Sequence, residues 1–149
     1  MAENEWIPDV LVLGTDGSEQ ALRASRIAAR LARAIDARLF IVTVVRPPEG
    51  WWGVVGSPPP ADQIGDALSE AQRKILDETV ASVDLSGIAW ETIEEIGDPA
   101  SVLSRICEEK GAGLLIVGRR GAGWVERMVI GSVADRVTRE APCPVLVVP

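Results

Sequence analysis

The chain has 149 residues, a length typical of one domain with a continuous core, and we expect a single domain over residues 1–149. Its formal net charge of −7 argues against nucleic-acid binding, and the absence of histidine removes the commonest general base and metal ligand. No apolar segment reaches the roughly 18 residues that a bilayer requires, and residues 1–5 are acidic, so we expect a cytoplasmic protein without a membrane segment.

The first predicted elements are a strand, a turn and a helix. Residues 10–14 form an apolar run, as expected for a central parallel strand that is covered on both faces. After it, either Ser18 or Asp16 can cap a helix that continues to Ile35. The apolar residues that should pack this helix on the sheet are Ala21, Leu22, Ala24, Ile27, Ala28, Leu31 and Ile35. The arginines on its opposite side, which we interpret as solvated, are Arg23, Arg26, Arg30 and Arg33.

A second apolar run at residues 39–45 completes a strand, helix and strand unit, which is right-handed in parallel sheets. Residues 46–60 then lose all periodicity, because proline and glycine recur through them. Trp51 and Trp52 in this loop could close over a nucleotide base. Packing on a neighbouring helix or across a dimer contact is the alternative that we favour for both tryptophans.

A second helix and an edge strand follow this loop. Residues 62–83 predict the helix, and its expected apolar stripe consists of Ile64, Leu68, Ala71, Ile75, Leu76 and Val80. Residues 89–96 predict the strand. Because glutamates occur on both of its faces, it is expected at the edge of the sheet, where charge discourages unwanted pairing.

The last part of the chain continues the alternation of helix and strand. Asp98 is a typical helix cap and Pro99 a typical first helical residue, and the helix should end at Lys110. Strands are predicted at residues 114–117 and 145–148, with a short helix before the second of them. The whole pattern predicts an α/β fold in which helices cover both faces of an open parallel sheet.

A glycine-rich loop follows the predicted strand at residues 114–117. Gly118, Gly121 and Gly123 can adopt positive φ and carry no Cβ, so the backbone can turn sharply and a ligand can approach its N–H groups. The chain then reaches a helix N-terminus at Gly131 and Ser132, where unpartnered N–H groups favour anions such as phosphate. The alternative is that these glycines serve only the turn.

Arginines give this loop a local positive charge. Arg119, Arg120 and Arg127 could contact phosphate, although each could also be a solvated loop residue. The two cysteines, Cys107 and Cys143, have no metal-site spacing, and we expect both to behave as small, mostly buried hydrophobes.

Four ordered motifs together resemble the universal stress protein family, in its ATP-binding branch, over nearly the whole chain. They are the Val-Leu-Gly-Thr-Asp-Gly-Ser segment at residues 12–18, Gly97-Asp98-Pro99, the spacing Gly118-x2-Gly121-x9-Gly131-Ser132, and Ala-Pro-Cys-Pro-Val-Leu-Val-Val at residues 141–148. The resemblance implies a Rossmann-like sheet of five parallel strands in the order 3-2-1-4-5, of the adenine nucleotide alpha hydrolase-like type. It also implies a homodimer through Val145–Val148, and ATP bound with Mg or Mn.

The resemblance also implies a role for each matching position. Asp16 would lie near ribose or a metal, although helix capping alone is an alternative, and Val44 would meet adenine through its backbone. The other implied nucleotide-binding residues are Gly118, Arg119, Gly121, Gly131, Ser132 and Val133. The chain departs from the family at Gly113, where Asp is frequent, and at Thr43, where His is frequent.

We therefore expect an ATP-binding regulatory homodimer of the stress response, in which nucleotide occupancy alters a surface read by a client protein. No catalytic residue and no protein metal-ligand set is expected. One alternative is a slow ATP hydrolase on the same fold, and turnover of roughly 1 per second or above would contradict a pure binding role. Another alternative is a dimerisation scaffold that binds no nucleotide.

Overall fold

The computed structural model describes residues 6–46, 61–121 and 130–149. Within these ranges the strands are β1 (Val10–Gly14), β2 (Arg38–Val45), β3 (Trp90–Ile96), β4 (Leu114–Gly118) and β5 (Val145–Val148). The helices are α1 (Glu19–Ile35), α3 (Ala61–Ser82), α4 (Pro99–Lys110) and α5 (Ser132–Glu140). The predictions for Trp51, Trp52, Gly123 and Arg127 fall outside the described residues.

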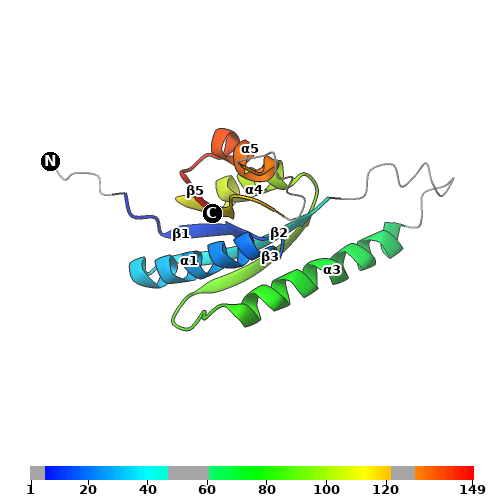
Figure 1. Cartoon of the computed structure of the whole chain (residues 1–149), viewed down its shortest axis with the longest axis horizontal. Coiled ribbons are helices and arrows are strands. Elements are labelled where there is room, and N and C mark those ends of the chain that lie inside the picture. The colour runs from blue at the N-terminus through cyan, green and yellow to red at the C-terminus, as the bar shows by residue number, and fades with distance from the viewer. Residues whose placement is uncertain (1–5, 47–60, 122–129) are drawn as a thin grey trace.

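The five strands form one parallel sheet in the order β3-β2-β1-β4-β5 (Figure 1). β1 lies in the centre, where it pairs with β2 on one side and with β4 on the other. The chain therefore builds outward in one direction from β1 to β3, and then in the opposite direction from β4 to β5. This arrangement confirms the predicted α/β fold and strand order.

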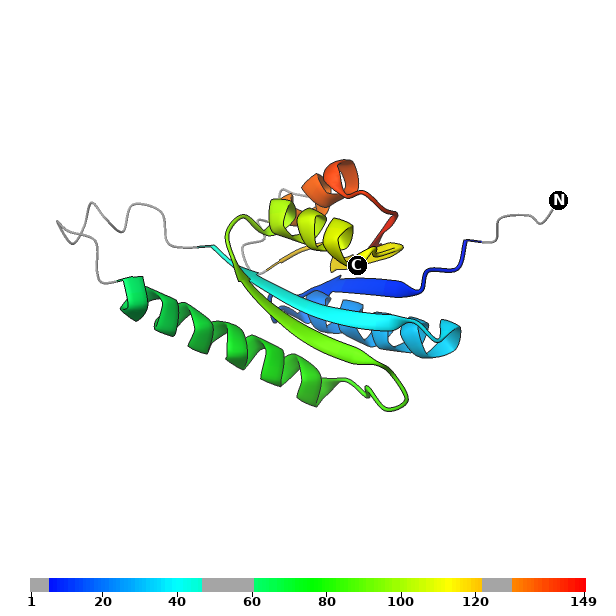
Figure 2. The same ribbon diagram turned by 180° about the vertical axis from the view of Figure 1, so that it is seen from behind.

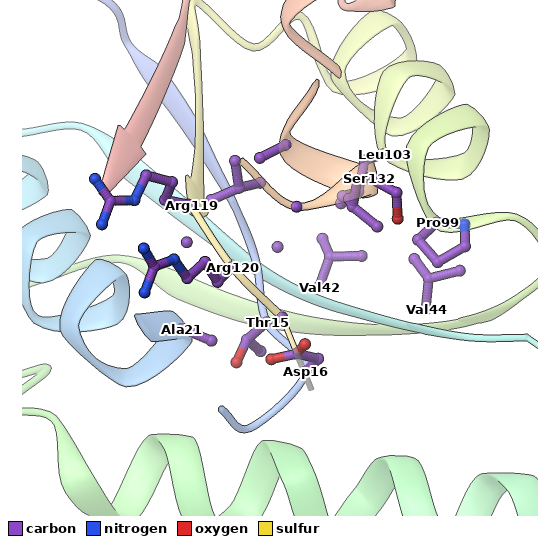
Figure 3. A pocket seen from close by; sticks show the side chains of 17 residues that line it. Thr15, Asp16, Ala21, Val42, Val44, Pro99, Leu103, Arg119, Arg120 and Ser132 are labelled. Carbon is purple, nitrogen blue, oxygen red and sulfur yellow. The ribbon is translucent and has the colours of Figure 1, made fainter. Parts of the chain in front are cut away.

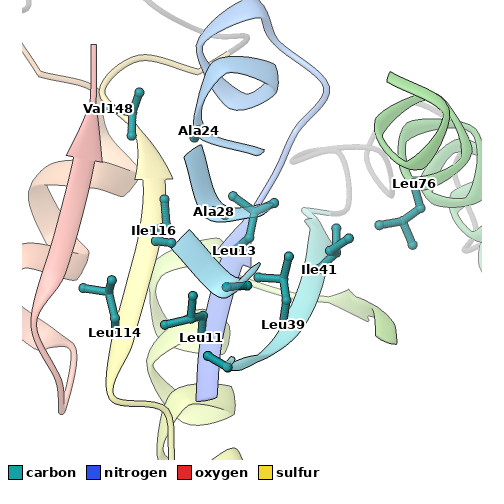
Figure 4. Close-up of a cluster of buried hydrophobic side chains, with 12 residues drawn as sticks. Leu11, Leu13, Ala24, Ala28, Leu39, Ile41, Leu76, Leu114, Ile116 and Val148 are labelled. Carbon is teal, nitrogen blue, oxygen red and sulfur yellow. The ribbon is translucent and has the colours of Figure 1, made fainter. Parts of the chain in front are cut away.

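Helices cover both faces of the sheet (Figures 1 and 2). On the side of α1 and α3, large side chains of the central strands meet alanines of α1 (Figure 4). The buried members of this first cluster include Leu11, Leu13, Leu39, Ile41, Ile116, Ala24 and Ala28. On the side of α4 and α5, a second cluster includes Val12, Phe40, Val42, Leu103, Ile106, Leu115 and Val137.

The buried face of α1 is made of smaller residues than predicted. Ser18 caps the helix by accepting a hydrogen bond from the N–H of Ala21 at 3.2 Å, which decides between the two candidate caps. Ile27 was expected on the sheet, but its side chain is 40% exposed. Small residues take that face because they let the helix axis approach the sheet closely; they are Ala21, Ala24, Ser25, Ala28, Ala29 and Ala32.

The buried stripe of α3 contains polar residues that the apolar pattern missed. Ala71, expected in the stripe, is exposed, whereas Gln72 is buried beside it. The Gln72 amide donates hydrogen bonds to two backbone carbonyls, that of Thr43 at 3.2 Å and that of Glu95 at 2.5 Å. Gln72 therefore fastens α3 to β2 and β3 through polar contacts that replace apolar packing.

β3 is an edge strand, as its glutamates predicted. Two of these glutamates make ion pairs with cations of neighbouring elements. Glu91 accepts a hydrogen bond from Arg38 of β2 at 2.8 Å, and Glu95 lies 3.4 Å from Arg105 of α4.

Among the helices in the described ranges, none is both long enough and apolar enough to cross a bilayer.

Candidate functional site

A cavity of about 210 Å³ lies where the carboxyl ends of β1 and β4 diverge (Figure 3). All eight residues that the sequence singled out for nucleotide binding line it: Asp16, Val44, Gly118, Arg119, Gly121, Gly131, Ser132 and Val133. The location follows from topology, because β1 and β4 are neighbours whose following segments leave the sheet toward opposite faces. Segments that are distant in the sequence thus meet at one edge of the sheet.

The turn after β1 places Asp16 against the glycine loop. Gly17 has a φ of 80°, which lets the chain turn back so that the Asp16 carboxylate accepts a hydrogen bond from the Ser18 N–H at 2.9 Å. A Cβ at Gly121 would lie 2.7 Å from Oδ2 of Asp16. Because Ser18 supplies the helix cap, capping does not account for Asp16, whose carboxylate instead lies against the backbone of the loop.

Close packing, and not an unusual φ angle, explains why glycine occurs at the motif positions Gly118, Gly121 and Gly131. Gly118 and Gly121 do not have positive φ, which corrects the expectation that they turn the chain in this way. A Cβ at Gly118 would lie 3.0 Å from the backbone of Gln20 at the start of α1. A Cβ at Gly131 would lie 3.0 Å from the carbonyl oxygen of Arg119. Gly118 and Gly131 therefore each allow two backbone segments at the cavity to touch, whereas Gly121 leaves room for the Asp16 side chain.

The N-terminus of α5 opens onto the cavity. Gly131 is the cap residue and offers no side-chain acceptor to the first turn. Its own N–H donates to the Arg119 carbonyl at 2.6 Å, so the start of the helix is fixed to the end of β4. The hydroxyl group of Ser132 is on an exposed residue of that turn. The first N–H groups of a helix lack intrahelical partners, so this end is suited to an anion.

Two arginines make one side of the cavity cationic. Arg119 and Arg120 are half-buried, and within the described part of the chain the Nε atom of Arg119 has no hydrogen-bond partner. The Arg119 backbone N–H donates to the carbonyl of Val148 at 2.7 Å, which holds this residue beside β5. In Figure 3 both arginine side chains lie on the side of the cavity opposite Val42 and Val44.

The opposite side of the cavity is apolar, and the sequence did not single out most of its residues. Val42 and Val44 come from the end of β2, while Pro99 and Leu103 come from the first turns of α4. Leu103 also belongs to the apolar cluster on the side of α4 and α5. Its contribution to the cavity depends on how α4 lies over the sheet, which no local pattern records. The other lining residues that were missed are Gly14, Thr15, Ala21, Val117 and Ala134, whereas Arg120, which the sequence analysis named as a possible phosphate contact, does line the cavity.

An ion-pair cluster joins the segments that carry this apolar wall. Asp98, the cap of α4, accepts a hydrogen bond from Arg136 of α5 at 2.6 Å and pairs with Arg46 at the end of β2. Partial burial opposes ionisation of Asp98, but hydrogen bonds from Ser101 and Arg136 outweigh it and lower the pKa to about 2. The carboxylate is therefore charged at neutral pH and bridges all three segments.

The described residues contain no cluster of three or more side chains of the types that commonly bind metals. Asp16 is the one carboxylate among the described residues that line the cavity. A divalent cation here would therefore need oxygen ligands besides Asp16, from water, backbone carbonyls or a bound anion.

Fold and cavity together define an open α/β protein with a ligand cavity at the point where strand order reverses. The profile of the universal stress protein family matches residues 9–149, and the chain therefore belongs to this family.

Individual relatives agree with this assignment. A universal stress protein of Methanocaldococcus jannaschii is 32% identical over 93% of this chain and 80% of its own length. Universal stress protein YxiE of Bacillus subtilis is 32% identical over 93% of this chain and 97% of its own length. Among solved structures, a universal stress protein in complex with cAMP is 29% identical, with a TM-score of 0.66 over 95% of this chain and 96% of that chain.

Proposed function

We propose that this protein binds ATP in the cavity and acts as a nucleotide-dependent regulatory homodimer in a stress response. The observation that carries the proposal is the mixed lining of the cavity, which brings together the cationic side chains of Arg119 and Arg120, the N-terminus of α5 and apolar side chains such as Val42 and Val44 (Figure 3). A nucleotide needs partners of both kinds, because it joins charged phosphates to a flat apolar base. The related protein in complex with cAMP supports an adenine nucleotide as the class of ligand.

In this proposal the phosphates lie at the N-terminus of α5. The backbone N–H groups of Ser132 and Val133 donate to phosphate oxygens, and the Ser132 hydroxyl adds a further donor. Arg119 contributes the buried Nε that has no hydrogen-bond partner among the described residues. Gly118 and Gly121 carry no side chain that would obstruct the approach of the ligand.

The base and ribose occupy the other end of the cavity. Val44 offers its backbone to adenine at the end of β2, and Val42 supplies an apolar surface beneath the ring. Asp16 lies near the ribose or shares a Mg or Mn ion with the phosphates, because the Ser18 N–H holds its carboxylate in the turn that follows β1. The ATP phosphates would supply the further oxygen ligands of such an ion, because the described residues contain no group of three or more His, Cys, Asp or Glu side chains that could hold a metal.

We further propose that two copies join through β5. This strand is at the edge of the sheet, so one of its sides has no strand neighbour within the described residues. Leu146 is 36% exposed there, although it lies in a strand of four apolar residues. Pairing with the same strand of a second copy would cover both the edge and this side chain.

Thermal unfolding with and without nucleotide tests the binding site. Millimolar ATP with magnesium, at about 100 times its dissociation constant, should stabilise the folded protein by about 2.7 kcal/mol, a rise of several degrees in melting temperature. GTP should produce little shift if adenine is selected. A melting temperature that changes with neither ATP nor cAMP would contradict the proposal and favour a dimerisation scaffold that binds no nucleotide.

A substitution at Gly131 then locates the ligand. Gly131→Val places a branched side chain where even a Cβ would lie 3.0 Å from the Arg119 carbonyl, so the α5 N-terminus should move and ATP binding should disappear. Circular dichroism and light scattering should show that the variant keeps its fold and its oligomeric state. If the folded variant still binds ATP, the nucleotide site does not lie at the N-terminus of α5.

A further inference from the structure

A groove lies between α1 and the end of α3, outside the candidate site. These two helices cover the same face of the sheet (Figures 1 and 2), and the groove has a volume of about 640 Å³. One wall is the outer face of α1 from Arg23 to Arg33, and the other consists of Ser82, Val83 and Asp84. No residue of the groove lines the nucleotide cavity, so the proposed function does not account for it.

The groove is cationic, and its two ends are held by hydrogen bonds. Nε of Arg23 donates to the main-chain oxygen of Pro149 at 3.0 Å. Arg33 donates to the backbone carbonyl of Asp84 at 2.7 Å, and its guanidinium lies 3.8 Å from the Asp84 carboxylate. Arg33 therefore fixes one wall of the groove to the other. Asp84 is the one acidic residue of the lining, whereas α1 contributes four arginines, namely Arg23, Arg26, Arg30 and Arg33.

The two arginines in the middle of the groove have no ion-pair partner among the described residues. Arg26 and Arg30 are exposed, and neither makes a hydrogen bond within the described ranges. They are four residues apart on one helix, so their side chains lie on one face and repel each other. The helix dipole favours cations near the C-terminus, which accounts for Arg33 but not for Arg26. An anion in the groove would supply the missing negative charge.

An apolar side chain accompanies these cations. Ile27 lines the groove and is 40% exposed. Arginine beside a partly exposed apolar side chain is a combination typical of protein interfaces. The arginines extend over about 15 Å from Arg23 to Arg33, because a helix rises about 1.5 Å per residue. Charges spread over this length match several carboxylates along a chain better than they match one compact phosphate group.

We propose that this groove is a docking site for an acidic segment of a partner protein, in which carboxylates flank an apolar side chain. The carboxylates pair with Arg26 and Arg30, since a guanidinium group binds a carboxylate through two parallel N–H groups, and the apolar side chain packs on Ile27. A groove accommodates a protein segment but fits a flat bilayer poorly. The formal net charge of −7 opposes a long nucleic acid, whereas salt screens a short segment in the groove from charges beyond about 8 Å.

Fluorescence anisotropy of the full-length protein, without nucleotide, tests the proposal. The probe is a fluorescein-labelled peptide in which glutamates flank a single leucine, and the control peptide carries glutamine in place of every glutamate. The acidic peptide should bind with an affinity that falls as salt is added, and the glutamine peptide should not bind. Because no nucleotide is present, failure of this test leaves the ATP proposal untouched, and a failure of ATP to bind leaves this one untouched.

Substitutions then locate the peptide on the protein. Arg26→Glu combined with Arg30→Glu should weaken binding of the acidic peptide by about tenfold or more, because two attractions become repulsions. Ile27→Ser should weaken it by a smaller factor through the loss of apolar contact. The control Arg73→Glu makes a charge reversal on the exposed side of α3, outside the groove, and should change the affinity little. All four positions are exposed, so each variant should keep the wild-type melting temperature.

Several results would overturn the proposal. One is an acidic peptide that binds no better than the glutamine peptide, and another is an equal loss of affinity in Arg73→Glu and in the groove variants. Binding of phosphatidylserine vesicles through Arg26 and Arg30, without binding of the peptide, would assign the groove to a membrane surface. Light scattering that shows a lower molecular mass for the doubly reversed variant than for wild type would make the groove a contact between two copies of this chain.

Discussion

Nη1 of Arg136, in the second turn of α5, donates a hydrogen bond to Oδ2 of Asp98, the cap of α4, over 2.6 Å. The bond joins the two helices whose first turns line the cavity. Its donor and acceptor are both about one-third exposed, so its value lies in fixing the relative position of the helices more than in a large electrostatic energy.

Replacing Asp98 with Asn tests this link through pH. Asn keeps a capping oxygen but removes the charge, so Asp98→Asn should lower the free energy of unfolding at neutral pH by about 1 kcal/mol. The native pKa of Asp98 is about 2, below its ordinary value of 3.8, so its contribution is complete above 3.8 and is lost as pH falls through 2. Urea titrations at different pH should show that the unfolding free energies of wild type and Asp98→Asn converge over this pH range. The control is Asp77→Asn, at an exposed position, whose unfolding free energy should follow that of wild type throughout.

Arg119→Ala should weaken ATP binding by about ten- to a hundredfold and leave adenosine binding nearly unchanged, because a hydrogen bond to a charged group contributes roughly 1.5–3 kcal/mol. Calorimetric titration with both ligands measures the two effects separately. Arg30→Ala, on the exposed face of α1, is the matched control and should bind ATP like wild type. Equal losses for ATP and adenosine would show that Arg119 supports the cavity but does not contact phosphate.

Gln72→Leu should destabilise the fold by roughly 1–3 kcal/mol, although it replaces a polar residue in the core with an apolar one of similar size. The substitution leaves the carbonyls of Thr43 and Glu95 without the donors they now have. Denaturant unfolding measures the change, and Arg73→Leu on the exposed side of α3 is the control. Unchanged or higher stability in Gln72→Leu would mean that apolar packing compensates for both hydrogen bonds.

Leu146→Asp should convert the proposed dimer into a monomer, because it places a charge on the edge strand where a second copy would pair. Size-exclusion chromatography with light scattering gives the mass directly. Ile27→Asp alters another exposed hydrophobic side chain, on α1, and should leave the mass unchanged. A wild-type protein that is monomeric at high concentration would contradict pairing through β5.

The order of elements could be predicted because buried strands and capped helices leave strong local patterns. The apolar run at Val10–Gly14 and the cap at Asp98 each carry their own signal. The faces of two helices could not be predicted as well. Alanines, and not Ile27, line the side of α1 that faces the sheet. Small side chains are needed there because the helix lies close to the sheet. In α3, Gln72 is buried because its amide donates to two backbone carbonyls of β2 and β3, a contact that the sequence of α3 alone does not reveal.

Motif spacing placed eight residues around one cavity, and topology explains why, since the carboxyl ends of parallel strands meet at one edge. Contacts between distant segments had no sequence signal. The approach of Gly121 to Asp16 depends on how the glycine loop packs against the turn after β1. Nucleotide contacts of these residues stay predictions until a ligand is measured.

The central position of β1 has a consequence for synthesis on the ribosome. β1, β2 and β3 emerge first and can pair with one another, but the second neighbour of β1 is β4, which emerges much later. The cavity is lined by residues of both the first three strands and the part of the chain from β4 onward. The hydrogen bond that holds the Arg119 backbone in position can form only after Val148 has been synthesised. A nascent chain should therefore bind a ligand only after β5 has emerged, so that ligand binding reports a sheet in which all five strands are in place.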